Sequence, residues 1–308
     1  MSTTTSSLSL PAPASYFPVI DNQYSTRAGL TKLGHDFGNG QQDAHLFQFD
    51  NQFSEYRNNK LQVREEALHE HVCAEATSES QLAVAARFIL EALCHEHPNY
   101  FCLDNMTLNC ALTQDKLQLK DDYSLANNVD YKNLFDALAL QVQEDICLMQ
   151  VDGSTSNLIA AHLCAPNHWS ARDKLGMDMF ALHDSVPEFL KENREPNQLM
   201  KGLYNKSQAY VRFAWGITEQ PILNQHPNLT TKHPAPSNNK VWMRIERQVI
   251  SPIPKTKMIL FTIRTYFRDC DSLEKQQRFG LISAINSMSD DTLNYKNINK
   301  TKILEKLN

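Results

Sequence analysis

The sequence predicts one α+β domain, in which an antiparallel or mixed sheet is flanked by helices. Apolar runs of strand length are separated by short turns about as often as by helices, unlike the regular strand–helix alternation of parallel α/β folds. The chain of 308 residues could hold one large domain or two small ones, but no clear linker divides its core. We therefore expect a leader over residues 1–15, a single domain over 16–297 with an N-terminal extension, and a tail over 298–308.

The N-terminal third is expected to be irregular at first and then mainly helical. Residues 1–15 are rich in Ser, Thr, Pro and Ala, and no positive charge precedes their apolar patch, which predicts a mobile leader and not a signal peptide. Residues 27–50 contain many Gly, Asn and Gln and predict a wrapped arm. Apolar periodicity then predicts, in order, helices over 53–66 and 79–94, a strand over 100–110 and a helix over 131–143.

The stretch 143–187 predicts a β-hairpin followed by two short helices. Residues 146–151 and 158–164 are apolar runs, separated by the turn-prone Asp152-Gly153-Ser154. A helix is expected over 169–175, because Gly176 is a natural stop.

His183 lies just before the start of the next predicted helix. We expect this helix over residues 186–192, with Ser185 as N-cap, Pro187 in the first turn and Glu188 completing a capping box. A histidine held between a sheet and a helix start either packs or takes part in chemistry, and the spacing leaves both open.

The C-terminal third supplies the longest predicted strands. A polar loop of unusual length for a compact domain separates the first of these strands from the other two. The expected elements, in order, are a strand over 210–217, the loop over 218–240, strands over 241–250 and 258–267, a helix over 273–288 and a frayed tail over 297–308.

Composition excludes several classes of protein. The net charge of −5 provides no basic surface for nucleic acid, and no apolar run has the length of a membrane span. The seven cysteines are scattered without a C-x-x-C pair, which is typical of reduced thiols in a cytoplasm and not of disulfides, zinc sites or iron–sulfur clusters.

One predicted strand carries charges on both of its faces. Period-two alternation places Trp242, Arg244, Glu246 and Gln248 on one face, and Arg247 among apolar residues on the other. In the next strand, a clean apolar row takes one face and Arg264 lies on the opposite face.

These arginines require counter-ions or an anionic ligand, because an unpaired buried charge is strongly destabilising. Carboxylates such as Glu144, Asp145 or Glu246 would make a structural ion-pair network, which the pattern alone favours. The carboxylates or phosphates of a cofactor would serve equally well.

The eleven histidines contain no metal-binding spacing such as H-E-x-x-H. His183 is the best single candidate for a ligand or an acid–base group, because elements on both sides fix its position. Nucleotide-binding and α/β-hydrolase motifs such as G-x-G-x-x-G, the P-loop and G-x-S-x-G are absent from the sequence. The absence of C-x-x-C-H means that any haem would be held non-covalently.

A series of short motifs runs through roughly residues 16–297. They are Arg27-Ala28-Gly29-Leu30, Val142-Gln143-Glu144-Asp145-Ile146-Cys147-Leu148-Met149, Cys164-Ala165-Pro166-Asn167-His168-Trp169, Lys174-Leu175-Gly176, Leu182-His183-Asp184-Ser185-Val186-Pro187, Arg212-Phe213-Ala214-Trp215, Met243-Arg244-Ile245-Glu246-Arg247-Gln248, Leu260-Phe261-Thr262-Ile263-Arg264-Thr265-Tyr266 and Tyr295-Lys296. Together and in this order, they resemble the family of the haem-dependent oxidative N-demethylase α-subunit. The chain departs from the family at Ala214, where Asn is frequent, at Ser185, where Pro is frequent, and at Asn297, where Gly is frequent.

The resemblance implies a PAS-like antiparallel sheet, flanked by helices, that binds haem b. It implies the haem-carrying subunit of an oxygenase that uses O2 to oxidise an N-methyl group of a small secondary amine and releases formaldehyde. Electrons would come from a separate flavin and iron–sulfur reductase subunit, and neither nucleic acid nor a membrane would be a partner.

Under this hypothesis, the candidate residues have distinct roles. His183 would be the axial iron ligand through a neutral imidazole nitrogen. Glu246 or Asp145 would hold an amine cation or relay protons. Arg244, Arg247 and Arg264 would bind the haem propionates. Trp215 and Trp242 would form apolar walls of the haem pocket.

Two other functions compete with this one. PAS-like folds often sense haem or small molecules, although no kinase, cyclase or DNA-binding segment is attached here. The chain would instead be a non-catalytic binding protein if its arginine-bearing strands formed only a structural network.

Overall fold

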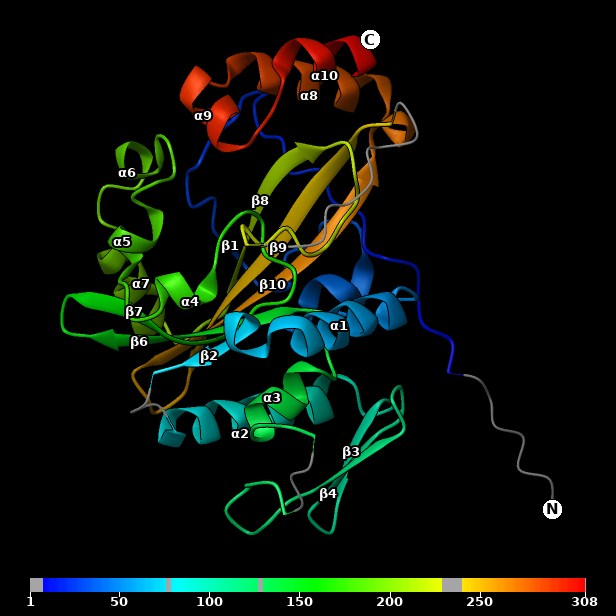
Figure 1. The fold of residues 1–308 in the computed structure, drawn as a ribbon, viewed down its shortest axis with the longest axis vertical. Coiled ribbons are helices and arrows are strands. Elements are labelled where there is room, and N and C mark those ends of the chain that lie inside the picture. The colour runs from blue at the N-terminus through cyan, green and yellow to red at the C-terminus, as the bar shows by residue number, and fades with distance from the viewer. Residues whose placement is uncertain (1–7, 76–78, 127–129, 229–239, 308) are drawn as a thin grey trace.

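The structure is a computed structural model that describes residues 8–75, 79–126, 130–228 and 240–307 (Figure 1). The sequence predicts an antiparallel or mixed sheet for this α+β chain, and the main sheet is antiparallel at every strand pair. Within the described residues, this seven-stranded sheet has the order β1 (Thr31–Lys32), β8 (Tyr210–Thr218), β9 (Trp242–Ile253), β10 (Met258–Asp269), β6 (Asp145–Asp152), β7 (Thr155–His162) and β2 (Val72–Ala74). A smaller antiparallel sheet has the order β3 (Phe101–Asp104), β4 (Thr107–Cys110) and β5 (Asp115–Gln118).

Helices surround the main sheet in three groups (Figure 1). The first group contains α1 (Phe53–His71), which is interrupted at Ala67, with α2 (Glu79–Glu96) and α3 (Leu134–Ala139). The second contains α4 (Ala171–Lys174), α5 (Met179–His183), α6 (Phe189–Glu192) and α7 (Pro196–Asn205). The third contains α8 (Lys275–Ser287), α9 (Asp290–Tyr295) and α10 (Lys300–Leu307), and short 3-10 turns form at Gly40–Ala44 and Cys270–Ser272.

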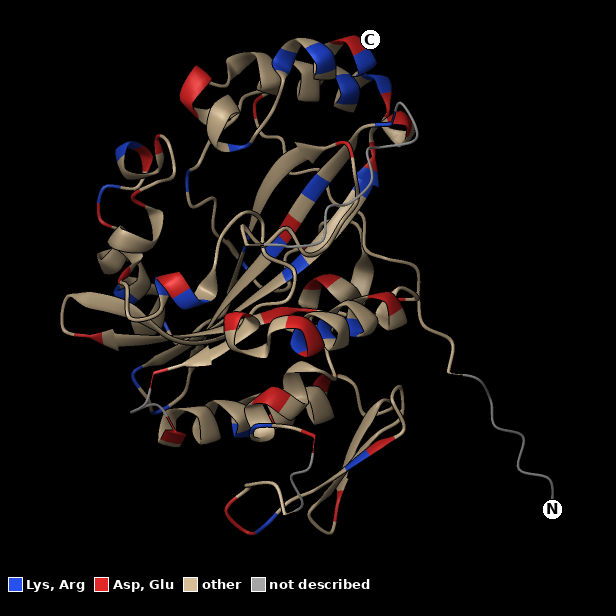
Figure 2. Cartoon of the chain, viewed as in Figure 1, with Lys and Arg blue, Asp and Glu red and all other residues tan. Residues whose placement is uncertain are grey.

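The two faces of the sheet have different partners. On one face, apolar residues of β6–β10 pack against α2, α3 and residues 46–53, and against α8–α10 further along β8 and β9. On the other face, Cys147, Met149 and Ile263 belong to a cluster with Met200 and Leu203 of α7. Charged residues interrupt the otherwise uncharged middle of β8–β10 (Figure 2). The candidate functional site lies on this second face.

The register confirms the predicted alternation in the long strands. Glu246 pairs with Ala214 of β8 and Thr265 of β10, whereas Arg247 pairs with Phe213 and Arg264. Directly paired residues point to the same side of an antiparallel sheet, and consecutive residues of one strand point to opposite sides. Glu246 therefore shares a face with Ala214 and Thr265, and Arg247 lies on the opposite face with Phe213 and Arg264.

Several predicted elements differ from those observed. The predicted strand over 100–110 is the hairpin β3–β4, because Asn105 (φ 45°) and Met106 (φ 59°) adopt left-handed conformations that turn the chain. The helix expected to start after Ser185 begins only at Phe189, since Glu188 has a φ of 65° and makes no side-chain cap. In place of a frayed tail, residues 300–307 form α10, whose Ile303 and Leu307 are buried.

The predicted leader and polar loop fall partly outside the described residues, at 1–7 and 229–239. Within the leader, Ala14 is buried in the cluster with α8–α10, and the Ser15 amide donates to Asn39. No helix in the described part of the chain is both long and apolar enough to cross a membrane.

Candidate functional site

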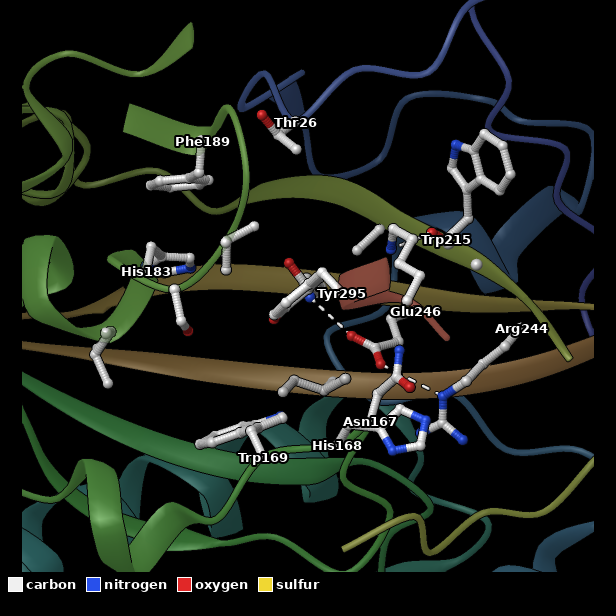
Figure 3. A pocket seen from close by; sticks show the side chains of 18 of the residues that line it. Thr26, Asn167, His168, Trp169, His183, Phe189, Trp215, Arg244, Glu246 and Tyr295 are labelled. Carbon is white, nitrogen blue, oxygen red and sulfur yellow. Dashed lines mark hydrogen bonds and ion pairs between the residues drawn. The ribbon is translucent and has the colours of Figure 1, made fainter. Parts of the chain in front are cut away.

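A cavity of about 910 Å³ lies on the second face of the sheet (Figure 3). Its floor is formed by β8–β10, and residues of α5–α7, the N-terminal arm and the end of α9 close it. This volume is within the range of about 300–1,000 Å³ that is usual for small-molecule and cofactor sites.

The lining changes from apolar to polar along the cavity. Ala214, which has only a methyl group, and Gly216, which has no side chain, leave room above β8. The apolar part is formed by Met149, Leu158, Leu182, Phe189, Met200 and Ile250, and the polar part by Arg212, Arg244, Glu246, Gln248 and Lys296.

His183 lies at the apolar part, as the last residue of α5 (Figure 3). Its Nδ1 donates to the Met179 carbonyl oxygen at 2.9 Å, and its ring stacks on Phe189 with centroids 4.0 Å apart. This hydrogen bond fixes the proton on Nδ1 and leaves Nε2 with a free lone pair. Burial lowers the pKa of His183 to about 4, despite the opposing effect of the Met179 carbonyl, so the ring is neutral at pH 7.

Glu246 lies at the polar part of the floor (Figure 3). It accepts a hydrogen bond from Gln248 Nε2 at 3.0 Å and lies 3.5 Å from Arg244 Nε. Gln248 in turn accepts from Arg212 Nη1 at 2.8 Å. The carboxylate is thus oriented by the side chains that precede and follow it on the same strand face.

Arg244 is mostly committed to the protein backbone. Its Nη2 donates to the Ala165 carbonyl at 2.6 Å, and its Nη1 donates to the carbonyls of Ile222 and Leu223 at 3.0 and 3.1 Å. Its Nε is buried and has no hydrogen-bond partner among the described residues. Arg244 therefore holds two loops at the cavity and has little capacity left for a propionate.

The structure does not bring the three predicted arginines together. Arg247 and Arg264 lie on the opposite face of the sheet and do not line the cavity. Arg264 forms a buried ion pair with Asp50 at 2.6 Å, and Arg247 donates to the His45 carbonyl at 2.7 Å. At these two positions the structure favours the structural-network interpretation over the cofactor interpretation.

Asp145 and Trp242 also lie outside the cavity lining. Both Asp145 oxygens accept backbone N–H groups, from Cys164 at 2.8 Å and from Ala165 at 2.7 Å. Asp145 therefore fixes the segment to which Arg244 is bonded. Trp242 has the Lys240 ammonium 5.6 Å from its ring.

Trp215 borders the cavity mainly with its backbone. Its register partner is Ile245, on the face opposite to Glu246, and its ring packs edge-on against Tyr24. The Trp215 carbonyl accepts from Lys296 Nζ at 3.0 Å.

His168 is a second histidine at the cavity, near Arg244 (Figure 3). Its backbone has a φ of 59°, held by the hydrogen bond from its amide to the Gln225 carbonyl at 3.0 Å. Burial lowers the pKa of His168, and Arg244 and Lys296 lower it further. The left-handed backbone conformation is unfavourable for a residue other than glycine, and such conformations cluster at functional sites.

Two cations of the cavity were not selected from the sequence. Arg212 donates through Nε to the Ala28 carbonyl at 2.9 Å, and burial lowers its pKa. Lys296 lies at the end of α9, and burial lowers its pKa to about 8, while Glu246 raises it. The only sequence signal for these two residues was their presence in the motifs Arg212-Phe213-Ala214-Trp215 and Tyr295-Lys296. No pattern within either segment indicates that the two segments are in contact.

The N-terminal arm closes the cavity by binding α6. Glu192 Oε2 accepts from the Thr26 amide at 2.5 Å, from Thr26 Oγ1 at 2.8 Å and from Ser25 Oγ at 2.9 Å. Asn193 Oδ1 accepts from the Ala28 amide at 3.0 Å. Residues 24–30, which we call the N-terminal arm and which overlap the start of the arm predicted over 27–50, thus form one wall of the site.

Protein side chains alone do not assemble a metal centre here. Among the residues that the structure describes, no group of three or more His, Cys, Asp or Glu side chains could hold a metal ion. A haem iron requires only one or two protein ligands, and a histidine such as His183 can supply one of them.

The comparison with known families identifies the family of the chain. The family model for haem-dependent oxidative N-demethylase, alpha subunit-like, matches residues 39–304, which include the hairpin β6–β7, His183, the long strands β8–β10 and Lys296. Since the match covers most of the chain, the protein belongs to the haem-dependent oxidative N-demethylase alpha subunit-like family.

Proposed function

We propose that this chain binds haem b non-covalently in the 910 Å³ cavity and is the haem-carrying subunit of an oxidative N-demethylase-like oxygenase with a PAS-like fold. The observation that carries the proposal is the state of His183. A neutral imidazole lines the cavity, with Nδ1 bonded to the Met179 carbonyl and Nε2 free for iron. Axial histidines are commonly oriented through a hydrogen bond from the second ring nitrogen in this way.

The remaining lining also suits haem. A b-type haem has a large apolar surface and two carboxylates, and the cavity offers an apolar part beside His183 and cations at its polar part. Arg212 replaces Arg247 and Arg264 as the candidate for a propionate. Its Nη2 has no hydrogen bond among the described residues.

Bound haem would supply oxygen activation, for the net conversion of an N-methyl amine, O2, two electrons and two protons to the demethylated amine, formaldehyde and water. The protein's part in this reaction is positioning and proton transfer. Glu246 is the one carboxylate that the structure places on the polar floor beside both Arg244 and Gln248, and we assign it to hold the amine cation or to relay a proton. Asp145, whose two oxygens are taken by backbone amides, has a positioning role.

The electrons would come from a separate flavin and iron–sulfur reductase subunit, and the substrates would be a small secondary amine and O2. Ala214 pairs with Glu246 on the cavity floor, and its side chain is smaller than the Asn that is frequent in the family. The cavity therefore has more room at this position. A substrate larger than the simplest dialkylamine would then be accommodated. All seven cysteines are free, which supports a reducing cytoplasm as the site of action.

The test is a haem titration of the purified protein, followed by ferric and ferrous absorption spectra. We expect a Soret band in the wild-type protein and changed ferric and ferrous spectra in His183→Ala. His168→Ala is the matched control, since it removes the other histidine of the cavity and should keep the wild-type axial spectrum. Absence of a Soret band, or a His183→Ala spectrum identical to that of the wild type, would contradict the assignment.

Activity distinguishes an oxygenase from a haem-based sensor with the same spectrum. The haem-loaded protein, given a chemical reductant, should release formaldehyde from secondary N-methyl amines only when O2 is present. Glu246→Gln should lower this rate by about 10²–10⁴-fold if it relays a proton, without abolishing the Soret band. A haem-loaded protein that releases no formaldehyde from any such amine would favour the sensor.

A further inference from the structure

We propose that Lys296 is a carbonyl-reactive amine, which forms an iminium adduct with small aldehydes that enter the cavity. The proposal rests on the proposed function for the source of such an aldehyde, because N-demethylation would release formaldehyde in this cavity. The reactivity of the amine itself depends only on the protein and requires no haem.

The position of Lys296 suits this chemistry. Its Nζ is half-buried at the polar part of the cavity, donates to the Trp215 carbonyl at 3.0 Å and lies 5.2 Å from the centre of the Tyr24 ring. On the floor below, Gly216 has no side chain, and a Cβ built there would lie 3.8 Å from Nζ. The amine is therefore held by one hydrogen bond, with space beside it.

The surroundings of Lys296 favour an amine that loses its proton. Its charged and titratable neighbours are Glu246 on β9, Tyr24 on the N-terminal arm and His168 in the loop after β7. Burial lowers the pKa of Lys296 to about 8, although Glu246 opposes this shift. An amine with that pKa is about 10% neutral at pH 7, whereas an ordinary lysine with a pKa near 10.4 is about 0.04% neutral.

Lys302 provides a contrast in the same cavity. Its ammonium forms an ion pair with Glu219 at 2.7 Å, and Glu219 also pairs with Lys306. Lys302 is thus held against a carboxylate, whereas Lys296 Nζ donates to the neutral Trp215 carbonyl.

The reaction balances without an oxidant or a reductant. Glu246 takes one proton from the Lys296 ammonium, and the neutral amine adds to the aldehyde carbon to form a carbinolamine. The returning proton then leaves with the hydroxyl group as water, so that ammonium plus formaldehyde gives iminium plus water. Glu246, the charge partner of Lys296, is the base and acid of this exchange.

The experiment uses the full chain without haem. The protein is incubated with isotope-labelled formaldehyde and cyanoborohydride, which reduces the iminium to a labelled methyl-lysine, and peptide mass mapping follows each lysine over time and pH. We expect Lys296 to be labelled at least about tenfold faster than Lys302 at pH 7. This factor is smaller than the ratio between the neutral fractions of Lys296 and of an ordinary lysine, because a less basic amine is a weaker nucleophile. The rate at Lys296 should rise up to about pH 8 and then level off, whereas the rate at an ordinary lysine with a pKa near 10.4 continues to rise.

A matched pair of variants completes the test. Lys296→Met should remove the fast-labelled site, and Lys302→Met should leave it in place. Equal labelling rates at the two lysines, or a rate at Lys296 that still rises above pH 9, would overturn the proposal. Because no haem is present, a negative result here leaves the haem spectrum as an independent measure of the proposed function.

Discussion

Arg264 and Asp50 form an ion pair inside the protein, on the sheet face opposite the cavity. Their side chains are 0% and 1% exposed, and the Arg264 guanidinium also lies 3.7 Å from the centre of the Tyr56 ring. Asp50 accepts a further hydrogen bond from Gln143 Nε2 at 3.0 Å. Such a pair contributes little net stability compared with apolar residues, but removing one partner leaves a buried charge without compensation.

Asp50→Asn should therefore destabilise the protein by about 3–5 kcal/mol, because the Arg264 guanidinium would remain buried without its carboxylate. The free energy of unfolding in urea measures this effect. Asp152→Asn is the matched control, since Asp152 pairs with Lys257 at the surface, where both side chains are mostly exposed, and it should cost about 0–1 kcal/mol. Equal losses in the two variants would show that Arg264 does not depend on Asp50.

Cys164, His162 and Asp136 show why a constellation of reactive residue types is not by itself a site. Cys164 Sγ lies 3.6 Å from His162 Nδ1, and His162 Nε2 lies 3.1 Å from Asp136 Oδ1, in the order of a thiol nucleophile and its base. Burial raises the pKa of the Cys164 thiol well above its usual value and lowers that of His162. Since none of the three lines the cavity, the set is a packed hydrogen-bond chain.

The long strands β6–β10 could be predicted from sequence because their signals are local, whereas the short strands β1, β2 and β5 were not predicted. Alternation with period two placed Glu246 and Arg247 on opposite faces, and the observed register agrees. The α5–α6 region was harder, because the left-handed conformation of Glu188, which delays α6, has no glycine or asparagine signal in the sequence.

The positions of Arg212 and Lys296 at the polar part of the cavity could not be predicted, because they depend on contacts between distant segments. Lys296 meets Trp215, which is 81 residues away, and Arg212 meets Ala28, which is 184 residues away. A pattern in one segment identifies a face, but not which other segment will cover it. His183 could be selected because its neighbours in sequence, Met179 and Phe189, also determine its orientation.

α10 is an element whose packing outweighs its weak sequence signal. It contains several lysines, but Ile303 and Leu307 lie on one side and are 4% and 1% exposed against α8. The Leu307 carbonyl also accepts from Arg278 Nη1 at 3.0 Å.

Leu307→Ala should lower the free energy of unfolding by about 2–5 kcal/mol, because it removes buried apolar contacts and leaves a cavity. Thr301→Ala, at an exposed position of the same helix, should change it by no more than about 0.5 kcal/mol. Chemical denaturation of both variants checks this expectation. A frayed C-terminus would instead make the two substitutions equally harmless.

The cavity is built from the whole length of the chain. The N-terminal arm, the central β6–α7 region, the strands β8–β10 and the C-terminal α9 each supply a wall, so that no part of the sequence contains the site alone. Glu192 joins the first of these walls to α6. Although burial alone would raise the pKa of this carboxyl, hydrogen bonds from Thr26 and Ser25 hold it below its usual range.

Glu192→Ala should loosen the arm and thereby open the cavity. Loss of hydrogen bonds to a half-buried carboxylate costs about 2 kcal/mol, which raises the population of the detached arm by roughly 30-fold. Arg27 is exposed and lies in the arm, so trypsin cleavage after Arg27 measures this population. Glu195 is exposed and makes no side-chain cap on α7, so Glu195→Ala is the control and should leave the cleavage rate unchanged.

If the haem lies behind the arm, Glu192→Ala should also release haem faster to an acceptor protein. Increased cleavage without faster haem loss would place the haem's exit path elsewhere.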